Sequence, residues 1–150
     1  MDLPRDDVGV VIVDHGSRRA ESNELLLEVV KQYVSAYPHY FVEPAHMELA
    51  EPTLADAFGS CVSRGAKLVI VHPYFLLPGR HWDSDIPRLA AEAAKAHPGV
   101  KYLVTAPLGL HPLMVDVIQS RIEQCLRHAI GEHDACDLCE GTDRCEFRNG

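Results

Sequence analysis

Apolar residues follow two different spacings that alternate along the chain. Apolar runs rich in β-branched residues cover residues 9–13 and 67–73, and weaker runs cover 40–47 and 102–105. Such runs are typical of strands that are buried on both faces of a parallel sheet. Between them, apolar residues recur every three or four positions, as on the buried face of a helix. The alternation predicts an α/β fold in which a parallel sheet of about four strands lies between layers of helices.

Proline, glycine and aspartate mark the ends of the predicted helices. The first helix should end before Pro38, and the second should begin at Pro52 and end near Gly65. Asp85 is placed to cap the third helix, and Pro112 to open the last one. The apolar stripe of that last helix is predicted to face the core and consists of Met114, Val117, Ile118, Ile122, Cys125 and Leu126.

Length and charge narrow the class of protein. A chain of 150 residues suits one domain with a substantial core, and we expect that domain at 1–130 with a cysteine-rich tail at 131–150. The formal net charge of -8 argues against a general nucleic-acid binder, which carries a basic face. The sequence has no apolar run near the roughly 20 residues that cross a bilayer. The first residues do not resemble a secretory signal either, so we expect no membrane association.

Residues with functional chemistry follow the predicted strands. His15 follows the first strand directly, within Asp14-His15-Gly16-Ser17. Right-handed crossovers bring the carboxyl ends of parallel strands to one edge of the sheet, where open α/β sheets bind their ligands. The residues expected at that edge with His15 are Glu48 and Glu51 after the second strand, Arg80 and His81 after the third, and His111 after the fourth.

Two histidines among carboxylates suit metal binding and proton transfer. Imidazole binds Fe, Co, Ni, Cu and Zn, so the residue types do not name the metal. Neutral imidazole also accepts protons near pH 7. The alternative for each histidine is simple packing at a strand end. The start of a helix at Pro112 is sufficient to explain His111.

An apolar loop and several arginines surround this predicted edge. Leu76, Leu77, Pro78 and Gly79 form a loop where solvent exposure is expected, which suggests contact with a flat apolar ligand. A subunit interface would explain the same loop, and both can hold together. Arg18, Arg19 and Arg80 flank the histidines, and guanidinium groups recognise carboxylates in a bidentate way.

Three motifs together resemble one family. Val-Asp-His-Gly-Ser-Arg at 13–18, Glu-Leu-Ala-Glu-Pro-Thr at 48–53 and Gly-Arg-His-Trp-Asp-Ser-Asp-Ile-Pro at 79–87 are similar to the small sirohydrochlorin chelatases of the CbiX/SirB family. The similarity covers about residues 8–130 in order and spacing. It implies the chelatase-like three-layer α/β/α sandwich. It also implies insertion of a divalent metal into sirohydrochlorin, giving sirohaem with iron or a cobalamin precursor with cobalt.

The resemblance also implies residue roles. His15 and His81 would hold the metal, with His15 also accepting a proton, and Glu51 and the segment from Leu76 to His81 would contact the tetrapyrrole. From their places near the histidines, and apart from the resemblance, Glu48 is a further candidate ligand and Arg18 a further candidate substrate contact. A single domain of this kind offers a shallow cleft, and larger relatives carry two such halves. We therefore expect a homodimer with two-fold symmetry.

The tail carries a second cluster of candidate ligands. Cys136, Cys139 and Cys145 follow Cys125, and four thiolates can hold an iron–sulfur cluster or a structural zinc. The tail is similar to that of plant-type members of the family, which make sirohaem in plastids. That similarity favours a [2Fe–2S] cluster and a plastid location, with a transit peptide absent from this chain; otherwise the expected location is cytoplasmic.

The sequence therefore favours a sirohydrochlorin ferrochelatase that uses Fe(II) as substrate. The alternatives are a sirohydrochlorin cobaltochelatase and a redox module that carries a cluster. A histidine phosphoesterase is a third reading, because His-Gly beside arginine also suits phosphate chemistry. It is disfavoured because Asp14 stands where such enzymes have an arginine before the histidine.

Overall fold

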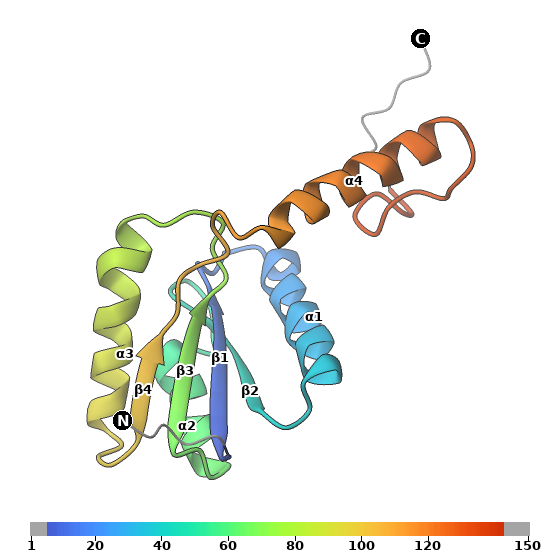
Figure 1. Cartoon of the computed structure of the whole chain (residues 1–150). Coiled ribbons are helices and arrows are strands. Elements are labelled where there is room, and N and C mark those ends of the chain that lie inside the picture. The colour runs from blue at the N-terminus through green and yellow to red at the C-terminus, as the bar shows by residue number, and fades with distance from the viewer. Residues whose placement is uncertain (1–5, 143–150) are drawn as a thin grey trace. The chain divides into compact units, whose positions relative to one another are not determined.

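Four parallel strands form the sheet in the computed structural model, which describes residues 6–142 (Figure 1). Within these residues the strand order is β2-β1-β3-β4, so the central strands are the two most apolar runs of the sequence. The α/β class and the parallel sheet predicted from the sequence are confirmed. The strands are β1 (Val8–Asp14), β2 (Phe41–His46), β3 (Leu68–Pro73) and β4 (Lys101–Val104).

Helices cover both faces of the sheet and complete three layers. Helix α1 (Ala20–Ala36) packs on one face, and α2 (Leu54–Ser63) and α3 (Ile86–Lys95) pack on the other (Figure 1). Alternate residues of a strand point to opposite faces, so β1 contributes to both cores. The cluster under α1 contains Val10, Ile12, Leu26, Val30 and Val42.

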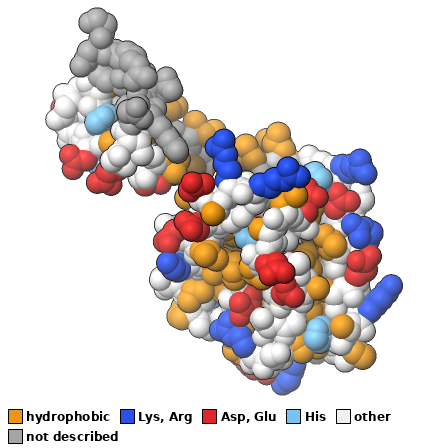
Figure 2. All heavy atoms as spheres, turned by 180° about the vertical axis from the view of Figure 1, so that it is seen from behind, with side chains coloured by type: hydrophobic (Ala, Val, Ile, Leu, Met, Phe, Trp, Pro, Cys, Tyr) orange, Lys and Arg blue, Asp and Glu red, His pale blue; other side chains and the backbone are white. Residues whose placement is uncertain are grey.

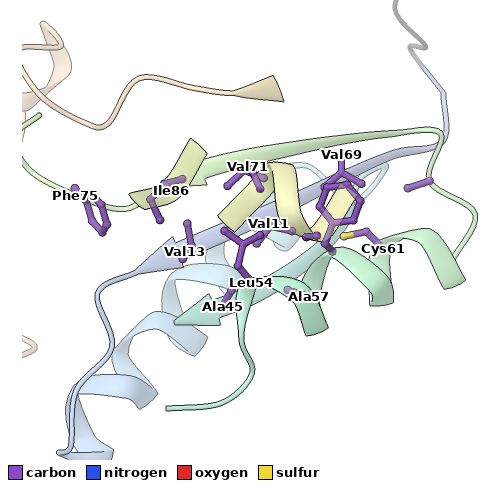
Figure 3. Close-up of a cluster of buried hydrophobic side chains, with 14 residues drawn as sticks. Val11, Val13, Ala45, Leu54, Ala57, Cys61, Val69, Val71, Phe75 and Ile86 are labelled. Atoms are coloured by element: carbon purple, nitrogen blue, oxygen red, sulfur yellow. The ribbon is translucent and has the colours of Figure 1, made fainter. Parts of the chain in front are cut away.

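The larger core lies between the sheet and the helices α2 and α3 (Figure 3). Phe58 and Cys61 of α2 are fully buried there beside Val11 of β1. Gly9 permits this close packing, because a Cβ atom at that position would lie 2.6 Å from the Cβ of Cys61. Burial of each large side chain contributes roughly 1.5–3 kcal/mol, so this packing holds β1 in the sheet. His15 directly follows that strand.

The helix starts differ in part from those predicted. Thr53 rather than Pro52 caps α2: its hydroxyl accepts from the Asp56 amide, and the Asp56 carboxylate accepts from the Thr53 amide. The expectation that Asp85 caps α3 is wrong, because its side chain makes no capping hydrogen bond. A short π-helical turn, η1 (His81–Asp85), runs directly into α3. The Ile86 amide therefore already donates to the His81 carbonyl.

The chain divides into two compact units, at Met1–Gly109 and Leu110–Gly150. The second contains α4 (Leu113–Ala129) and begins where His111 Nδ1 accepts a hydrogen bond of 3.2 Å from the Leu113 amide. The role expected of His111 at a helix start is thus observed. No α4 side chain is buried within the described residues. The expectation that the α4 stripe faces the core and our division at residue 130 both stay predictions.

Two global features bear on possible partners. Among residues 6–142, no helix combines the length and apolar character that crossing a membrane requires. Figure 2 shows acidic and basic side chains interspersed with apolar ones over the face seen from behind. Over the whole sequence acidic side chains outnumber basic ones, and the formal net charge is -8.

Candidate functional site

His15 and His81 meet at the carboxyl edge of the sheet, as the sequence predicted. The ring of His15 stacks on Phe75, with centroids 4.2 Å apart and an interplanar angle of 19°. Its other neighbour is the ring of His81, whose centroid lies 4.7 Å away at an angle of 84°. Phe75 is buried, whereas His15 is exposed. The buried aromatic ring therefore supports an imidazole that solvent and ligands can reach.

The Asp85 carboxylate lies within hydrogen-bonding distance of the His81 ring. In the turn η1, the Nδ1 atom of His81 lies 2.7 Å from the Oδ2 atom of Asp85. The side chains are 44% and 24% exposed, so the pair lies partly out of solvent. This contact was not predicted from the sequence, because Asp85 was expected to cap the third helix. The available signal was the four-residue spacing between the two side chains on a helical turn.

A second carboxylate–imidazole pair lies under the loop that carries His15. Asp14 Oδ1 lies 2.6 Å from Nδ1 of His46 and also accepts from the Gly16 amide at 3.0 Å. His46 is 2% exposed and ends β2. The sequence analysis treated His46 as a packing residue and did not foresee its partner. Its position at a strand end was the only signal in the sequence.

Backbone contacts tie the segment after β2 to the same loop. The Glu48 amide donates to the His15 carbonyl at 3.1 Å, and the Met47 amide donates to the Asp14 carbonyl at 2.8 Å. Gly16, with φ of 84°, permits this approach, because a Cβ atom there would lie 1.8 Å from the Glu48 carbonyl oxygen. The backbone of Glu48 is thus adjacent to that of His15. Its carboxylate is exposed, and among residues 6–142 no three His, Cys, Asp or Glu side chains are grouped to hold a metal.

The apolar loop of the sequence is exposed. Leu76 and Leu77 are 60% and 64% exposed, at the end of the loop that Phe75 anchors in the core. The amides of Leu108 and Gly109 donate to the Phe75 and Leu76 carbonyls at 3.0 and 2.7 Å. The loop is thereby held against the segment after β4. The remaining exposed residues here are Pro78, Gly79 and Arg80.

Arg18, Arg80 and Glu51 are exposed. Among the residues that the structure describes, their side chains make no hydrogen bond or ion pair. These side chains therefore retain their full capacity to bind polar groups of a ligand. Contact between them and a ligand stays a prediction.

A separate cavity of about 380 Å³ lies on the α1 face of the sheet. His72 lines it, with Nδ1 2.7 Å from the Thr105 hydroxyl, and burial lowers the pKa of this imidazole. The neighbouring wall is apolar and includes Ile12 and Tyr33. Neither His15 nor His81 borders this cavity, so it lies apart from the paired histidines.

Three of the four candidate cluster ligands lie in the described part of the chain: Cys125 in α4, and Cys136 and Cys139 in the tail. Cys125 is exposed, and Cys136 and Cys139 are partly exposed, whereas Cys145 lies outside the described residues. Hydrogen bonds from the Leu138 and Cys139 amides, and then from the Cys139 side chain, lower the pKa of Cys136. Paired hydrogen bonds join the Arg121 guanidinium to the Asp137 carboxylate and hold the tail against α4.

Comparison with known families fits this arrangement. The profile of the CbiX family matches residues 9–125, which contain both histidines and all three motifs. The chain belongs to the CbiX family. The match ends at Cys125, so the tail lies beyond it.

Relatives and solved structures agree with this membership. The chain is 55% identical to "Sirohydrochlorin ferrochelatase, chloroplastic" of Arabidopsis thaliana over 141 residues, covering 94% of this chain and 63% of that protein. A putative cobalamin biosynthesis CbiX protein from Marinobacter aquaeolei superposes with a TM-score of 0.70 at 26% identity, over 81% of this chain and 98% of the other. The sirohydrochlorin chelatase SirB from Bacillus subtilis subspecies spizizenii, in complex with cobalt, gives 0.72 at 28% identity, over 77% of this chain and 50% of SirB.

Proposed function

We propose that the chain is a sirohydrochlorin ferrochelatase that inserts Fe(II) into sirohydrochlorin to form sirohaem. The observation that carries the proposal is the pair of accessible imidazoles, His15 and His81, with ring centroids 4.7 Å apart at the ligand-binding edge of the sheet. The 55% identity to the Arabidopsis protein of that name supports the reaction class. Because this chain spans 63% of that protein, the activity is our proposal.

Metal insertion requires a ligand that presents iron and a base that takes protons. Two pyrrole N–H protons leave the macrocycle as one Fe(II) enters, so the bound metal replaces the charge of the two protons. His15 and His81 present the iron as substrate. As the iron passes to the macrocycle, the freed imidazole of His15 accepts one ring proton, and solvent, which reaches this exposed residue, takes the other. Few protein ligands and open coordination positions allow the metal to leave for the macrocycle. Glu48, whose backbone lies against His15, is a further candidate ligand.

The surface around the histidines suits a flat ring bordered by carboxylates. Leu76 and Leu77 offer exposed apolar contact for the macrocycle face. Arg18 and Arg80 offer guanidinium groups for its carboxylates. Glu51 and the segment from Pro78 to His81 complete the proposed substrate contacts.

We favour iron over cobalt as the metal substrate. The support is the ferrochelatase name of the Arabidopsis relative, at 55% identity. Solved structures of SirB contain either cobalt, at 28% identity, or Fe3+, at 27% identity, so they favour neither metal. Imidazole ligands bind both metals, so a sirohydrochlorin cobaltochelatase is the second candidate function.

We further propose a homodimer. The chain matches half of the SirB chain, so two copies would supply a surface of comparable size. Exposed apolar side chains on the 76–77 loop and on α4, including Val117 and Ile118, offer surface that a second copy would bury. A two-fold arrangement with facing clefts would enclose the macrocycle between the copies.

We also propose that Cys125, Cys136, Cys139 and Cys145 bind a resident [2Fe–2S] cluster, with zinc as the alternative. The donor set fits, because thiolates are the usual ligands of such clusters and amide donors surround the Cys136 sulfur. The four cysteines follow both histidines in the sequence, so we expect the cluster to serve stability or redox regulation and not catalysis. The chloroplastic relative supports a plastid location.

The test is an anaerobic assay with purified protein, sirohydrochlorin and either Fe(II) or Co(II). The absorption of the macrocycle should change with Fe(II) faster than in a matched reaction without protein. Acceleration by Co(II) alone would replace the proposal with the cobaltochelatase. Hydrolysis of a generic phosphate ester without metal insertion would replace it with a phosphoesterase. No acceleration with either metal would overturn the chelatase assignment.

A further inference from the structure

Asp85 lies where a capping residue was expected, yet its carboxylate serves another group. The first amide after η1, that of Ile86, already donates to the His81 carbonyl. The carboxylate makes no capping bond and instead lies 2.7 Å from Nδ1 of His81. Its hydrogen-bonding capacity is therefore directed at the histidine and away from the backbone of α3.

His81 and Asp85 are the first and last residues of the π-helical turn, four positions apart. The turn lengthens the backbone hydrogen bond to five residues, and the side chains of His81 and Asp85 lie on one side of it. Single π-helical turns next to α-helices occur frequently at functional sites. Here the turn connects the loop that carries His81 to the buried start of α3 at Ile86.

The contact determines which imidazole nitrogen carries the proton. An ionised carboxylate only accepts hydrogen bonds, so the Nδ1 atom of His81 must donate. In the neutral imidazole, the lone pair then belongs to Nε2. Asp85 is 24% exposed, so water replaces this bond less readily than at an open surface.

We propose that Asp85 is a positioning residue for metal insertion: it fixes the Nδ1–H tautomer and the ring orientation of His81, and so leaves Nε2 available to the metal. This inference rests on the proposed function of the histidine pair. It adds a residue that acts through His81 and does not touch the metal. Removal of an outer partner of this kind typically costs about 10- to 100-fold in metal affinity or activity.

The variant Asp85→Asn tests this with little change of shape. We expect its KM for Fe(II) to rise by about 10- to 100-fold, while the KM for sirohydrochlorin stays unchanged within error. Asp83→Asn is the matched control, because Asp83 is an exposed carboxylate in the same turn. That variant should keep both values. Asp85→Glu retains the acceptor and should lose less activity than Asp85→Asn.

A second measurement reads the tautomer itself. Long-range ¹H–¹⁵N NMR spectra of the metal-free protein, with the His81 signals assigned from a His81→Gln variant, should show the Nδ1–H form in the wild type. Asp85→Glu should keep that form, and Asp85→Asn should shift it toward Nε2–H. If Asp85→Asn does not fold, the wild-type spectrum and Asp85→Glu decide the matter, and an Nε2–H form in either would overturn the inference.

The two proposals fail in different ways. A wild-type chain that inserts no metal would overturn the proposed function, whatever the tautomer of His81. An active wild type together with an Asp85→Asn variant of unchanged KM for Fe(II) would overturn the role of Asp85 alone. A raised KM with an unchanged tautomer would also overturn it, because Asp85 would then act by another route.

Discussion

Single histidines carry the proposed chemistry, and their substitution is the first prediction. His15→Ala and His81→Ala should each reduce the insertion rate by about 100- to 10,000-fold, the usual cost of losing a positioned base. The fold should persist, because His15 is exposed and the His81 side chain is 44% exposed. The measurement is the insertion rate above the spontaneous reaction, alongside thermal unfolding.

His39→Ala is the control for these variants, because His39 is an exposed histidine on the segment before β2, outside the proposed site. It should retain the wild-type rate. If His15→Ala and His81→Ala also retain near-normal rates, the assigned site is wrong.

Gly16 is the residue whose substitution should perturb the site through the backbone. Its φ of 84° is unfavourable for alanine, and the new Cβ atom would lie 1.8 Å from the Glu48 carbonyl oxygen. Gly16→Ala should lower the free energy of unfolding by about 2–5 kcal/mol, from strain and overpacking together. Gly65→Ala is the matched control, since φ is 106° there but nothing lies within 4 Å of the added Cβ.

Denaturant unfolding of both variants distinguishes strain from collision. Gly65→Ala should cost only the strain of the left-handed backbone, roughly 1–2 kcal/mol. Equal losses of unfolding free energy in the two variants would show that the Glu48 carbonyl does not crowd position 16. In that case the loop would not hold His15 in the way described.

The proximity of His15 and His81 could be predicted from the sequence, because each follows a buried strand and parallel strands end at one edge. Their roles stay predictions. Asp85 and His46 were missed because their partners depend on side-chain direction. A local pattern gave Asp85 a helix cap, whereas the π-helical turn runs directly into α3 and the Asp85 carboxylate lies against the His81 ring.

At the scale of elements, hydrophobic spacing predicted strands and helices but not their junctions. The run at 67–73 became β3 (Leu68–Pro73), a central strand, as is typical of an apolar β-branched segment in a parallel sheet. The turn η1 was not foreseen, since one additional residue per turn leaves the apolar spacing almost unchanged. His81 and Asp85 are the first and last residues of this turn.

Cys61 offers a test of the packing between α2 and the sheet. Burial, with a smaller contribution from Glu43, raises the pKa of its thiol from 9.0 to about 12. The folded state thus retains a proton that the unfolded state loses above pH 9. The stabilisation is complete below pH 9 and is lost as the pH rises toward 12, and it amounts to at most about 4 kcal/mol.

Urea unfolding of the wild type and of Cys61→Ala at pH 7, 9 and about 10.5 measures this effect. Cys61→Ala removes the titrating group, so the stability advantage of the wild type should shrink as the pH rises. Other alkaline groups affect both proteins alike and cancel in the difference. A difference that is constant from pH 7 upward would contradict burial of a neutral thiol.

At the scale of the whole molecule, the sequence could not predict what covers the last helix. Its periodicity correctly identified α4 (Leu113–Ala129) as amphipathic. Periodicity shows which side chains form a stripe, but not which surface packs against that stripe. In the structure the stripe is exposed and belongs to the second compact unit.

The exposed apolar surface leads to the prediction of a dimer. Light scattering should give twice the 16.6 kDa mass of one chain at working concentration. The paired variant Leu76→Gln, Leu77→Gln tests whether the loop is part of the interface, because both leucines are exposed in the single chain. A dimer that persists in this variant would assign the loop to the substrate alone. A wild-type mass of 16.6 kDa would contradict dimerisation.

The tail gives the last prediction, which concerns its cysteines. Protein purified without oxygen should be brown and contain iron and acid-labile sulfide in equal amounts, as a [2Fe–2S] cluster requires. Serine in place of Cys125, Cys136, Cys139 or Cys145 should remove the colour. Cys61→Ala should keep it, because Cys61 is fully buried in the core of the first unit.

The same variants separate the cluster from catalysis. The tail begins beyond the segment that the CbiX family shares, and that segment contains both histidines. A chain in which all four candidate cluster ligands are replaced should therefore still insert Fe(II), with lower stability or altered redox sensitivity. Loss of insertion in a folded variant would give the cluster a catalytic role. Colourless wild-type protein with stoichiometric zinc would assign the thiolates to a structural zinc site, because tetrahedral Cys₄ zinc uses the same ligands.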